Sequence, residues 1–242
     1  MSGHSKWSNI KYKKSKEDNR KSRIFNRLIR EIYIAGQDQK KENSKNIANF
    51  KLKKAIQNAY AANMPKNTID RAIKKINEKN LQKFENIRYE GYVLFGVACI
   101  IDTITNNRNR TVSKIREIFK KYGGNLGRSG SVSYLFLEKG ILSFHTKNNE
   151  DRILEIAIKV KAEDINIKKN GFIDIITTPN KLISILKKIK IEKIYPYKNK
   201  IIPVAISKIM LDKNKNKEFS LFMNDLKNIE DVQNIYTNAK II

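Results

Sequence analysis

The stretch that decides the fold is residues 141–197, which read ILSFHTKNNEDRILEIAIKVKAEDINIKKNGFIDIITTPNKLISILKKIKIEKIYPY. Short β-branched runs of strand length alternate in it with two amphipathic helical patterns, and Asn170-Gly171 is typical of a hairpin turn. The resulting order is β-α-β-β-α-β, which predicts a ferredoxin-like split unit. Its expected strands are Ile141–Thr146, Ile165–Ile167, Phe172–Thr177 and Ile194–Tyr197, and its expected helices cover Ile153–Val160 and begin at Pro179.

The segments on either side predict a second α/β domain around the first. Before it, a strand near Phe95–Thr105 leads to a helix that stops at Gly123-Gly124, and then to a strand near Val132–Leu137. After it, strands at Ile202–Leu211 and Val232–Tyr236 enclose a helix. Because sequential units usually neighbour one another in space, we expect one ferredoxin-like domain inserted into the other.

The N-terminal third of the chain carries helical periodicity. One apolar stripe runs through Arg20–Ala35. A second helix follows the N-cap candidate Ser44 and ends before Met64-Pro65, because the residue preceding proline avoids helical geometry, and Pro65 then opens a third helix. The fold class is therefore α+β, with an N-terminal three-helix domain before the two α/β domains. The expected boundaries are 1–85 for a basic tail plus the helical bundle, 88–138 with 202–242 for the discontinuous α/β domain, and 139–201 for the inserted domain.

The charge balance favours nucleic acid or another polyanion as partner. The chain has 242 residues with 50 Lys+Arg against 24 Asp+Glu, which gives a net charge of +26. Residues 1–90 hold 23 basic and 9 acidic side chains, and residues 91–242 hold 27 and 15, so the charge is densest towards the N-terminus. Part of the lysine excess is also expected of an AT-rich genome, which makes the arginines the more telling cations.

The sequence lacks the features of membrane and secreted proteins. The longest apolar stretch, Val93–Ile101, is shorter than the ~20 residues that span a bilayer, and no apolar segment follows the basic N-terminus. A lone cysteine, Cys99, excludes an intramolecular disulfide and fits a reducing compartment. We therefore expect a cytoplasmic protein with no membrane partner.

The N-terminal segment up to Arg30 holds the first group of candidate nucleic-acid contacts. Ser2–Asn19 is expected to lack a fixed fold until it binds, and to deliver its lysine charges to phosphates. The only tryptophan, Trp7, either stacks on an exposed base or packs back onto the helical bundle. In the helix that follows, arginines lie opposite the apolar stripe, on the face expected to point outward and meet phosphates. The candidates are Lys6, Trp7, Lys11, Lys13, Lys14, Arg20, Arg23, Arg27 and Arg30.

A second candidate site lies where the strand ending at Thr105 meets the next helix. Two arginines stand there at a helix N-terminus, whose positive end prefers anions, so a bound phosphate would reconcile them. Asn109 is the residue that we expect to cap this helix. The glycine-rich loop 123–131 lacks the pattern of a phosphate-binding motif and is interpreted as a helix stop and strand entry, with one further arginine contact. The candidates are Asn107, Arg108, Arg110 and Arg128.

Catalytic chemistry finds little support in the residue types. The two histidines, His4 and His145, fall in the expected tail and in an expected strand, so no metal pair and no nucleophile–base couple is evident. Cys99 lies in an apolar run that is typical of a buried core thiol. We expect no catalytic residue, no metal, no cofactor and no small-molecule substrate.

Seven segments spread along the chain carry recognisable motifs: Met1–Lys11, Ile24–Ile32, Ala61–Lys66, Arg88–Tyr92, Thr105–Val112, Gly123–Gly127 and Asp231–Tyr236. Together they closely resemble the YebC family, which includes the mitochondrial translational activator of cytochrome oxidase subunit I. The likeness runs essentially from end to end and keeps the family's order of motifs. Two features depart from it: an apolar turn at Tyr92–Gly96, where the family commonly has a loop of glycine and proline, and a lysine-rich inserted domain where we would expect an acidic one.

The resemblance implies a helical N-terminal domain followed by two α/β domains, and a non-enzymatic regulator of gene expression. Family members are described both as DNA-binding transcriptional regulators and as ribosome-associated translational activators that relieve stalling at difficult sequences. DNA and ribosomal RNA, with the ribosome as a possible partner, therefore both stay open as ligands, and an enzyme or a pure protein-interaction module is a lesser alternative. Because the likeness begins at residue 1, we expect no presequence and a bacterial protein.

Overall fold

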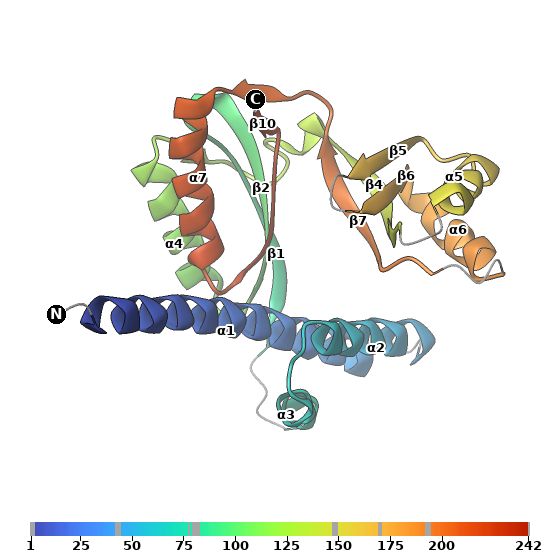
Figure 1. The fold of residues 1–242 in the computed structure, drawn as a ribbon, viewed down its shortest axis with the longest axis horizontal. Helices are drawn as coiled ribbons and strands as arrows, with labels where there is room; N and C mark the ends of the chain where they lie inside the picture. The colour runs from blue at the N-terminus through green and yellow to red at the C-terminus, as the bar shows by residue number, and fades with distance from the viewer. Residues whose placement is uncertain are drawn as a thin grey trace. The chain divides into compact units, whose positions relative to one another are not determined.

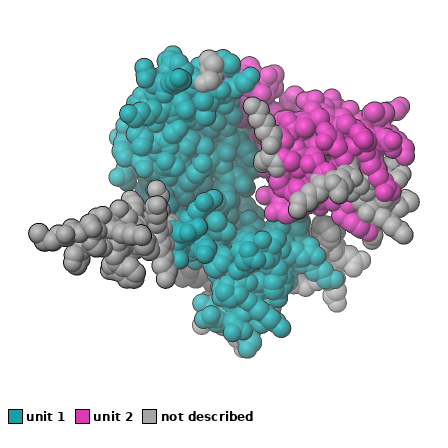
Figure 2. All heavy atoms as spheres, in the orientation of Figure 1, with its two compact units in different colours: residues 1–132, 210–242 teal, residues 133–209 magenta. Residues whose placement is uncertain are grey.

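The structure is a computed structural model that describes residues 3–41, 45–76, 78, 83–146, 150–168, 171–191 and 195–241. The chain divides into two compact units, one made of Met1–Val132 with Met210–Ile242 and the other of Ser133–Ile209 (Figure 2). The second unit is thus inserted in the first and extends beyond the expected 139–201 at both ends, and the first unit contains both the expected helical domain and the expected discontinuous α/β domain.

The first unit begins with α1 (Gly3–Lys41), α2 (Lys45–Ala61) and α3 (Lys66–Ile76) (Figure 1). Their shared apolar core is centred on Ile32, Ala59 and Ile69, each fully buried. Pro65 opens α3 as predicted, and its carbonyl accepts the first helical hydrogen bonds from Thr68 and Ile69. The predicted N-cap, Ser44, and most of the predicted linker 78–83 lie outside the described residues.

Helix α1 extends much further towards the N-terminus than the sequence analysis predicts. The prediction that Ser2–Asn19 lacks a fixed fold is wrong from Gly3 onward, because the backbone there continues the same helix. No proline or glycine interrupts residues 4–35, and Lys and Arg have high helix propensity. A high density of like charge therefore does not prevent the helix from extending.

The sheet of the first unit has the strand order β3-β1-β2-β9, with every neighbouring pair antiparallel. Helices α4 and α7 cover one face of it (Figure 1), and Phe119 and Phe222 meet there edge to face with ring centroids 5.5 Å apart. Strands β8 and β10 form a separate two-stranded ribbon. The elements are β1 (Glu85–Val93), β2 (Val97–Thr105), α4 (Arg108–Lys121), β3 (Asn125–Leu126), β8 (Ile209–Leu211), α7 (Lys213–Asn228), β9 (Val232–Thr237) and β10 (Ala239–Ile241).

The second unit confirms the predicted β-α-β-β-α-β order, with an antiparallel sheet in the order β5-β6-β4-β7. In the first unit, β3, β2 and β9 occupy the positions in the sheet that β5, β4 and β7 occupy in the second unit. The remaining position, which the third strand β6 holds in the second unit, is taken by β1, which precedes the other strands of the first unit. The elements of the second unit are β4 (Phe136–His145), α5 (Glu150–Lys159), β5 (Asp164–Lys168), β6 (Phe172–Thr177), α6 (Pro179–Ile191) and β7 (Lys198–Ala205).

Three strand predictions need correction. The expected strand Val132–Leu137 is wrong up to Leu135, because Ser133–Leu135 forms a 3-10 helix, and Phe136–Leu137 continue into the next expected strand as β4. Gly140 within β4 marks close packing and not a turn, because a Cβ there would lie 3.1 Å from the side chains of Leu182 and Thr177. The last strand of the inserted unit is β7, and not Ile194–Tyr197. Only the end of the expected strand Ile202–Leu211 returns to the first unit, as β8.

Strand β1 escapes the pattern analysis altogether. Exposed Arg88 and the buried but charged Glu90 interrupt its apolar positions, so it lacks the continuous apolar run that identifies β2. Gly91 further weakens the strand signal, although its lack of a side chain is what allows β3 to approach: a Cβ at this position would lie 2.4 Å from the carbonyl oxygen of Asn125.

Candidate nucleic-acid interface

The arginine stripe of α1 contacts the protein itself. Arg23 donates to the side-chain oxygen of Asn228, Arg27 to the backbone carbonyl of Gln233, and Arg30 to the backbone carbonyl of Glu230. These acceptors lie at the end of α7, in the turn after it and in β9. The predicted outward orientation is therefore wrong for Arg27 and Arg30, because the helix face opposite the bundle core is the face that meets the α/β sheet, whereas Arg23 is exposed although it contacts Asn228.

Among the remaining N-terminal candidates, the structure describes the side chain of one, Arg20. The side chain of Arg20 is exposed, as predicted. For Trp7, stacking on a base and packing on the bundle both stay predictions. The side chains that lie outside the described set are those of Lys6, Trp7, Lys11, Lys13 and Lys14.

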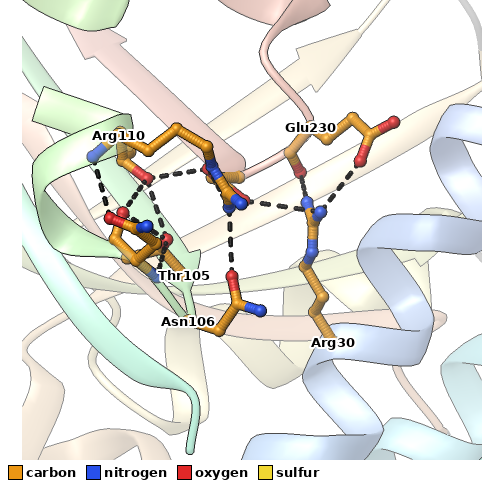
Figure 3. Close-up of polar contacts among 8 residues, drawn as sticks. Arg30, Thr105, Asn106, Arg110 and Glu230 are labelled. Atoms are coloured by element: carbon orange, nitrogen blue, oxygen red, sulfur yellow. Dashed lines mark hydrogen bonds and ion pairs between the residues drawn. The ribbon is translucent and has the colours of Figure 1, made fainter. Parts of the chain in front are cut away.

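The two arginine clusters converge on Asp231, whose side chain is buried. The Nη2 atom of Arg110 lies 3.2 and 3.1 Å from its two carboxylate oxygens, and Thr111 Oγ1 donates to Oδ2 at 2.7 Å. Arg30 Nη2 lies 3.4 Å from Oδ1 and 3.0 Å from the carboxylate of Glu230 (Figure 3). A carboxylate withdrawn from water needs paired charges and donors, and α1 and α4 together supply them.

The sequence predicts a bound phosphate beside the arginines at the N-terminus of α4, and the structure places the carboxylate of Asp231 next to Arg110 there. The anion that reconciles Arg110 with a helix N-terminus belongs to the chain, and it arrives from 121 residues further along the sequence. No local pattern reveals such a pairing. The only sequence signal for Asp231 is its place in the segment Asp231–Tyr236, one of those that resemble the YebC family.

Asn107, and not Asn109, caps helix α4. Its side-chain oxygen accepts the backbone N–H of Arg110 at 3.0 Å, and its own backbone is extended, with φ −147°. The cap lies two residues earlier than predicted because Thr105 Oγ1 accepts the backbone N–H of Asn107 at 2.9 Å, which ends β2 and fixes the start of the helix. This structural role accounts for Asn107 without a ligand.

Arg108 and Arg128 are both exposed. The loop that carries Arg128 is fixed by Glu90, a buried carboxylate that the sequence analysis does not single out. Its two oxygens accept the backbone N–H groups of Gly130 and Val132, each at 3.0 Å. The predicted helix stop is confirmed at Gly123, whose φ is +66°.

A groove of about 430 Å³ lies between α1 and the sheet of the first unit. Glu31 lines it from α1, and the paired side chains of Arg88 and Asp102, 2.7 Å apart, line it from the sheet. Gln233, the extra residue of a bulge in β9, also lines it. Two carboxylates in the groove disfavour phosphate, so backbone contacts of a nucleic acid are better placed on the exposed arginines outside it.

Comparison with known proteins decides the family. The family model described as "TACO1/YebC protein N-terminal domain" matches residues 5–79, and "TACO1/YebC second and third domain" matches residues 84–239. The chain belongs to the TACO1/YebC family. A "Probable transcriptional regulatory protein" of Nitrosococcus oceani is 40% identical over 240 residues, 99% of this chain and 96% of that protein. One of Francisella tularensis, with the same printed name, is 42% identical over 241 residues, with coverage of 99% and 96%.

A solved structure supports the fold of this TACO1/YebC protein. The crystal structure of a conserved hypothetical protein from Aquifex aeolicus matches it with a TM-score of 0.78 and 36% identity, over 91% of this chain and 90% of that one. Two segments that carry the family resemblance, Thr105–Val112 and Asp231–Tyr236, meet at Asp231 through Arg110 and Thr111. In this chain, these motifs build the scaffold that holds α1 and α4 together.

Cys99 lies in the core of this TACO1/YebC protein and is fully buried. Burial raises the pKa of its thiol well above the usual range, which keeps the group protonated and poorly nucleophilic. Within the described ranges, no group of three His, Cys, Asp or Glu side chains is placed to hold a metal ion. None of the helices described is long and apolar enough to cross a bilayer.

We predict that Asp231→Ala lowers the free energy of unfolding by about 3 kcal/mol, because it removes the buried carboxylate that Arg110, Thr111 and Arg30 share. Urea denaturation followed by circular dichroism measures the change. The matched control is Glu230→Ala, which removes a neighbouring carboxylate whose side chain is 60% exposed and is expected to cost less than about 1 kcal/mol. Equal effects of the two substitutions would contradict the central role of Asp231.

We also predict that Cys99 does not react with Ellman's reagent in the folded protein and reacts fully in urea. The raised pKa suppresses the thiolate at neutral pH, and burial excludes the reagent. Absorbance at the thionitrobenzoate band follows the reaction. Rapid stoichiometric release without denaturant would show that this strand opens in the native state.

Proposed function

We propose that this protein regulates gene expression by binding nucleic acid through its first unit. The observation that carries the proposal is the charge of that unit, which holds 35 Lys+Arg against 16 Asp+Glu, a net charge of +19. Arg30 and Arg110 are paired with Asp231 within the fold, although Arg110 remains accessible, and Arg20, Arg108 and Arg128 are exposed. A surface of this kind attracts a polyanion and gains affinity from the counterions that the polyanion releases.

Duplex DNA is the first candidate ligand. The relatives from Nitrosococcus oceani and Francisella tularensis are named probable transcriptional regulatory proteins, which supports a role in transcription. Arg108 at the start of α4 and Arg128 in the neighbouring loop would bind phosphates, with the basic segment of α1 that contains Lys6, Lys11, Lys13 and Lys14 as a further contact. The cytoplasm is the compartment that we propose for this activity.

Ribosomal RNA is the second candidate, and a specific observation favours it. Asn107 caps the N-terminus of α4, and Arg110 in its first turn is paired with Asp231. The described part of the first unit therefore offers contacts to phosphates more readily than a helix that reads bases. Recognition by shape and backbone is the common mode for structured RNA. A ribosome-associated activator of translation would need no more than this.

The test in solution is the double charge reversal Arg108→Glu/Arg128→Glu. Losing two phosphate contacts should weaken binding to duplex DNA of any sequence and lower the slope of log affinity against log salt by about 2. Fluorescence anisotropy over a salt series gives both quantities. The control Lys74→Glu/Lys75→Glu makes the same change in net charge on exposed positions of α3 and should leave the slope unchanged if the proposed contacts are correct.

The two ligands are separated in cells by comparing genomic occupancy with co-sedimentation on ribosomes. The charge reversal should abolish whichever association the wild-type protein shows, while the α3 control retains it. Loss of DNA occupancy alone supports the transcriptional role, and loss of ribosome association alone supports the translational one. If the charge reversal alters neither, the contact surface that we propose is wrong.

A further inference from the structure

The inserted unit keeps both of its helices on one face of its sheet. Helices α5 and α6 pack on Leu142 and Phe144 of β4 and on Ile173 and Ile175 of β6, and these residues form one buried core with the helices. Figure 1 shows both helices on the same side of the strands. Because successive residues of a strand point to opposite faces, the residues between these core positions belong to the other face of the sheet.

That other face carries a row of aromatic rings. His145 and Phe172 are register partners on β4 and β6, the two central strands, and their ring centroids lie 4.8 Å apart. The ring of Tyr197, just before β7, lies 5.7 Å from that of Phe172, and its side chain is 70% exposed. The three rings therefore expose aromatic surface at one end of this face of the sheet. Apolar surface is normally buried in the core, so its exposure here calls for an explanation.

Lysines gather on the same face beside the rings. Lys198 and Lys200 of β7 pair in register with Ser143 and Ile141 of β4, and Lys168 of β5 pairs with Phe172. All three lysines are exposed, and Lys168 makes an ion pair of 2.6 Å with Asp174.

Two of these lysines are close enough to the third, Lys200, to disfavour its charge. Partial desolvation lowers the pKa of Lys200, and so do the nearby charges of Lys198 and Lys168, whereas Asp174 opposes the shift. One carboxylate therefore serves a local group of three cations. A bound anion would relieve the remaining repulsion, and the whole unit, with 15 Lys+Arg against 8 Asp+Glu, is charged to attract one.

We infer that this face of the inserted unit binds single-stranded RNA, with unpaired bases stacked on His145, Phe172 and Tyr197 and phosphates held by Lys198 and Lys200. A four-stranded sheet whose central strands present aromatic rings to bases, beside cations for the backbone, has the chemistry that unpaired RNA requires. Duplexes are excluded from it because their bases are already stacked on one another. The inference rests on the proposed function and adds to it a second contact, in a separate unit of the chain.

The first experiment removes one ring at a time from the full-length protein. Tyr197→Ala and Phe172→Leu should each weaken binding of a single-stranded RNA of about eight nucleotides by about fivefold or more, since each removes a stacking surface. The matched control is Tyr195→Ala, which removes another exposed tyrosine two residues from Tyr197. Binding of duplex DNA, measured in parallel, should be unchanged in all three variants, and this also shows that they remain folded.

The second experiment reverses charge on the same face. Lys198→Glu/Lys200→Glu should weaken single-stranded RNA binding and lower its salt dependence, whereas Lys181→Glu/Lys208→Glu, an equal change at exposed positions outside the lysine group, should not. A direct readout on the wild-type protein avoids mutation altogether. The chain has two histidines, so the imidazole proton signal of His145 is readily assigned by NMR and should shift when a base stacks on it.

The outcomes separate this inference from the proposed function. Loss of RNA affinity in the ring variants with intact duplex binding supports the inference, and equal losses with single-stranded DNA would show that the face does not select RNA. If the ring variants and Tyr195→Ala behave alike and the His145 signal stays in place, the inference is overturned while the proposed function stands. If the wild-type protein binds no nucleic acid at low salt, the proposed function itself fails.

Discussion

The buried carboxylate of Asp231 is the interaction on which the first unit depends. It receives two contacts from Arg110 and one hydrogen bond from Thr111 at the start of α4, and it lies within ion-pair distance of Arg30 from α1. Charge withdrawn from water is tolerated only where such partners converge. One side chain therefore links the long N-terminal helix, the helix after β2 and the last strand of the main sheet. The helical bundle and the sheet β3-β1-β2-β9 belong to a single compact unit, and the contacts of Asp231 are among those that join them.

This arrangement changes the meaning of the charge. Arginines that look like phosphate contacts in the sequence, Arg27, Arg30 and Arg110, donate to carbonyls and carboxylates of the chain itself. The remaining positive charge then divides between two kinds of surface. The first unit exposes single arginines suited to a phosphate backbone, and the inserted unit combines lysines with the ring row of His145, Phe172 and Tyr197. A regulator built in this way would engage nucleic acid through two independent parts of its chain.

Much of the fold is predictable from local chemistry. Pro65 and Pro179 open helices, Gly123 ends one, and the periodicities of residues 141–197 predict the inserted unit and its order of elements. The strands that the sequence patterns did not predict have physical explanations. Gly140 suggests a break but allows α6 to approach β4, and β1 contains polar residues, including the buried Glu90, so that no apolar run marks it. The candidate site was less predictable: its residue types were identified, whereas Asp231 and Glu90, the carboxylates that organise it, were not.

By itself, the sequence determined the helical and strand periods, the positions where elements begin and end, the excess of positive charge and membership of a recognisable family. These depend on neighbours within a few residues, or on composition. Only the tertiary structure decided which charges are paired, because Arg23 meets Asn228 across 205 residues and Arg110 meets Asp231 across 121. It also decided that His145 and Phe172 stand side by side, since strand register sets that distance. Whether a charge contacts the protein or remains available to a ligand depends on such long-range partners, and no local pattern specifies them.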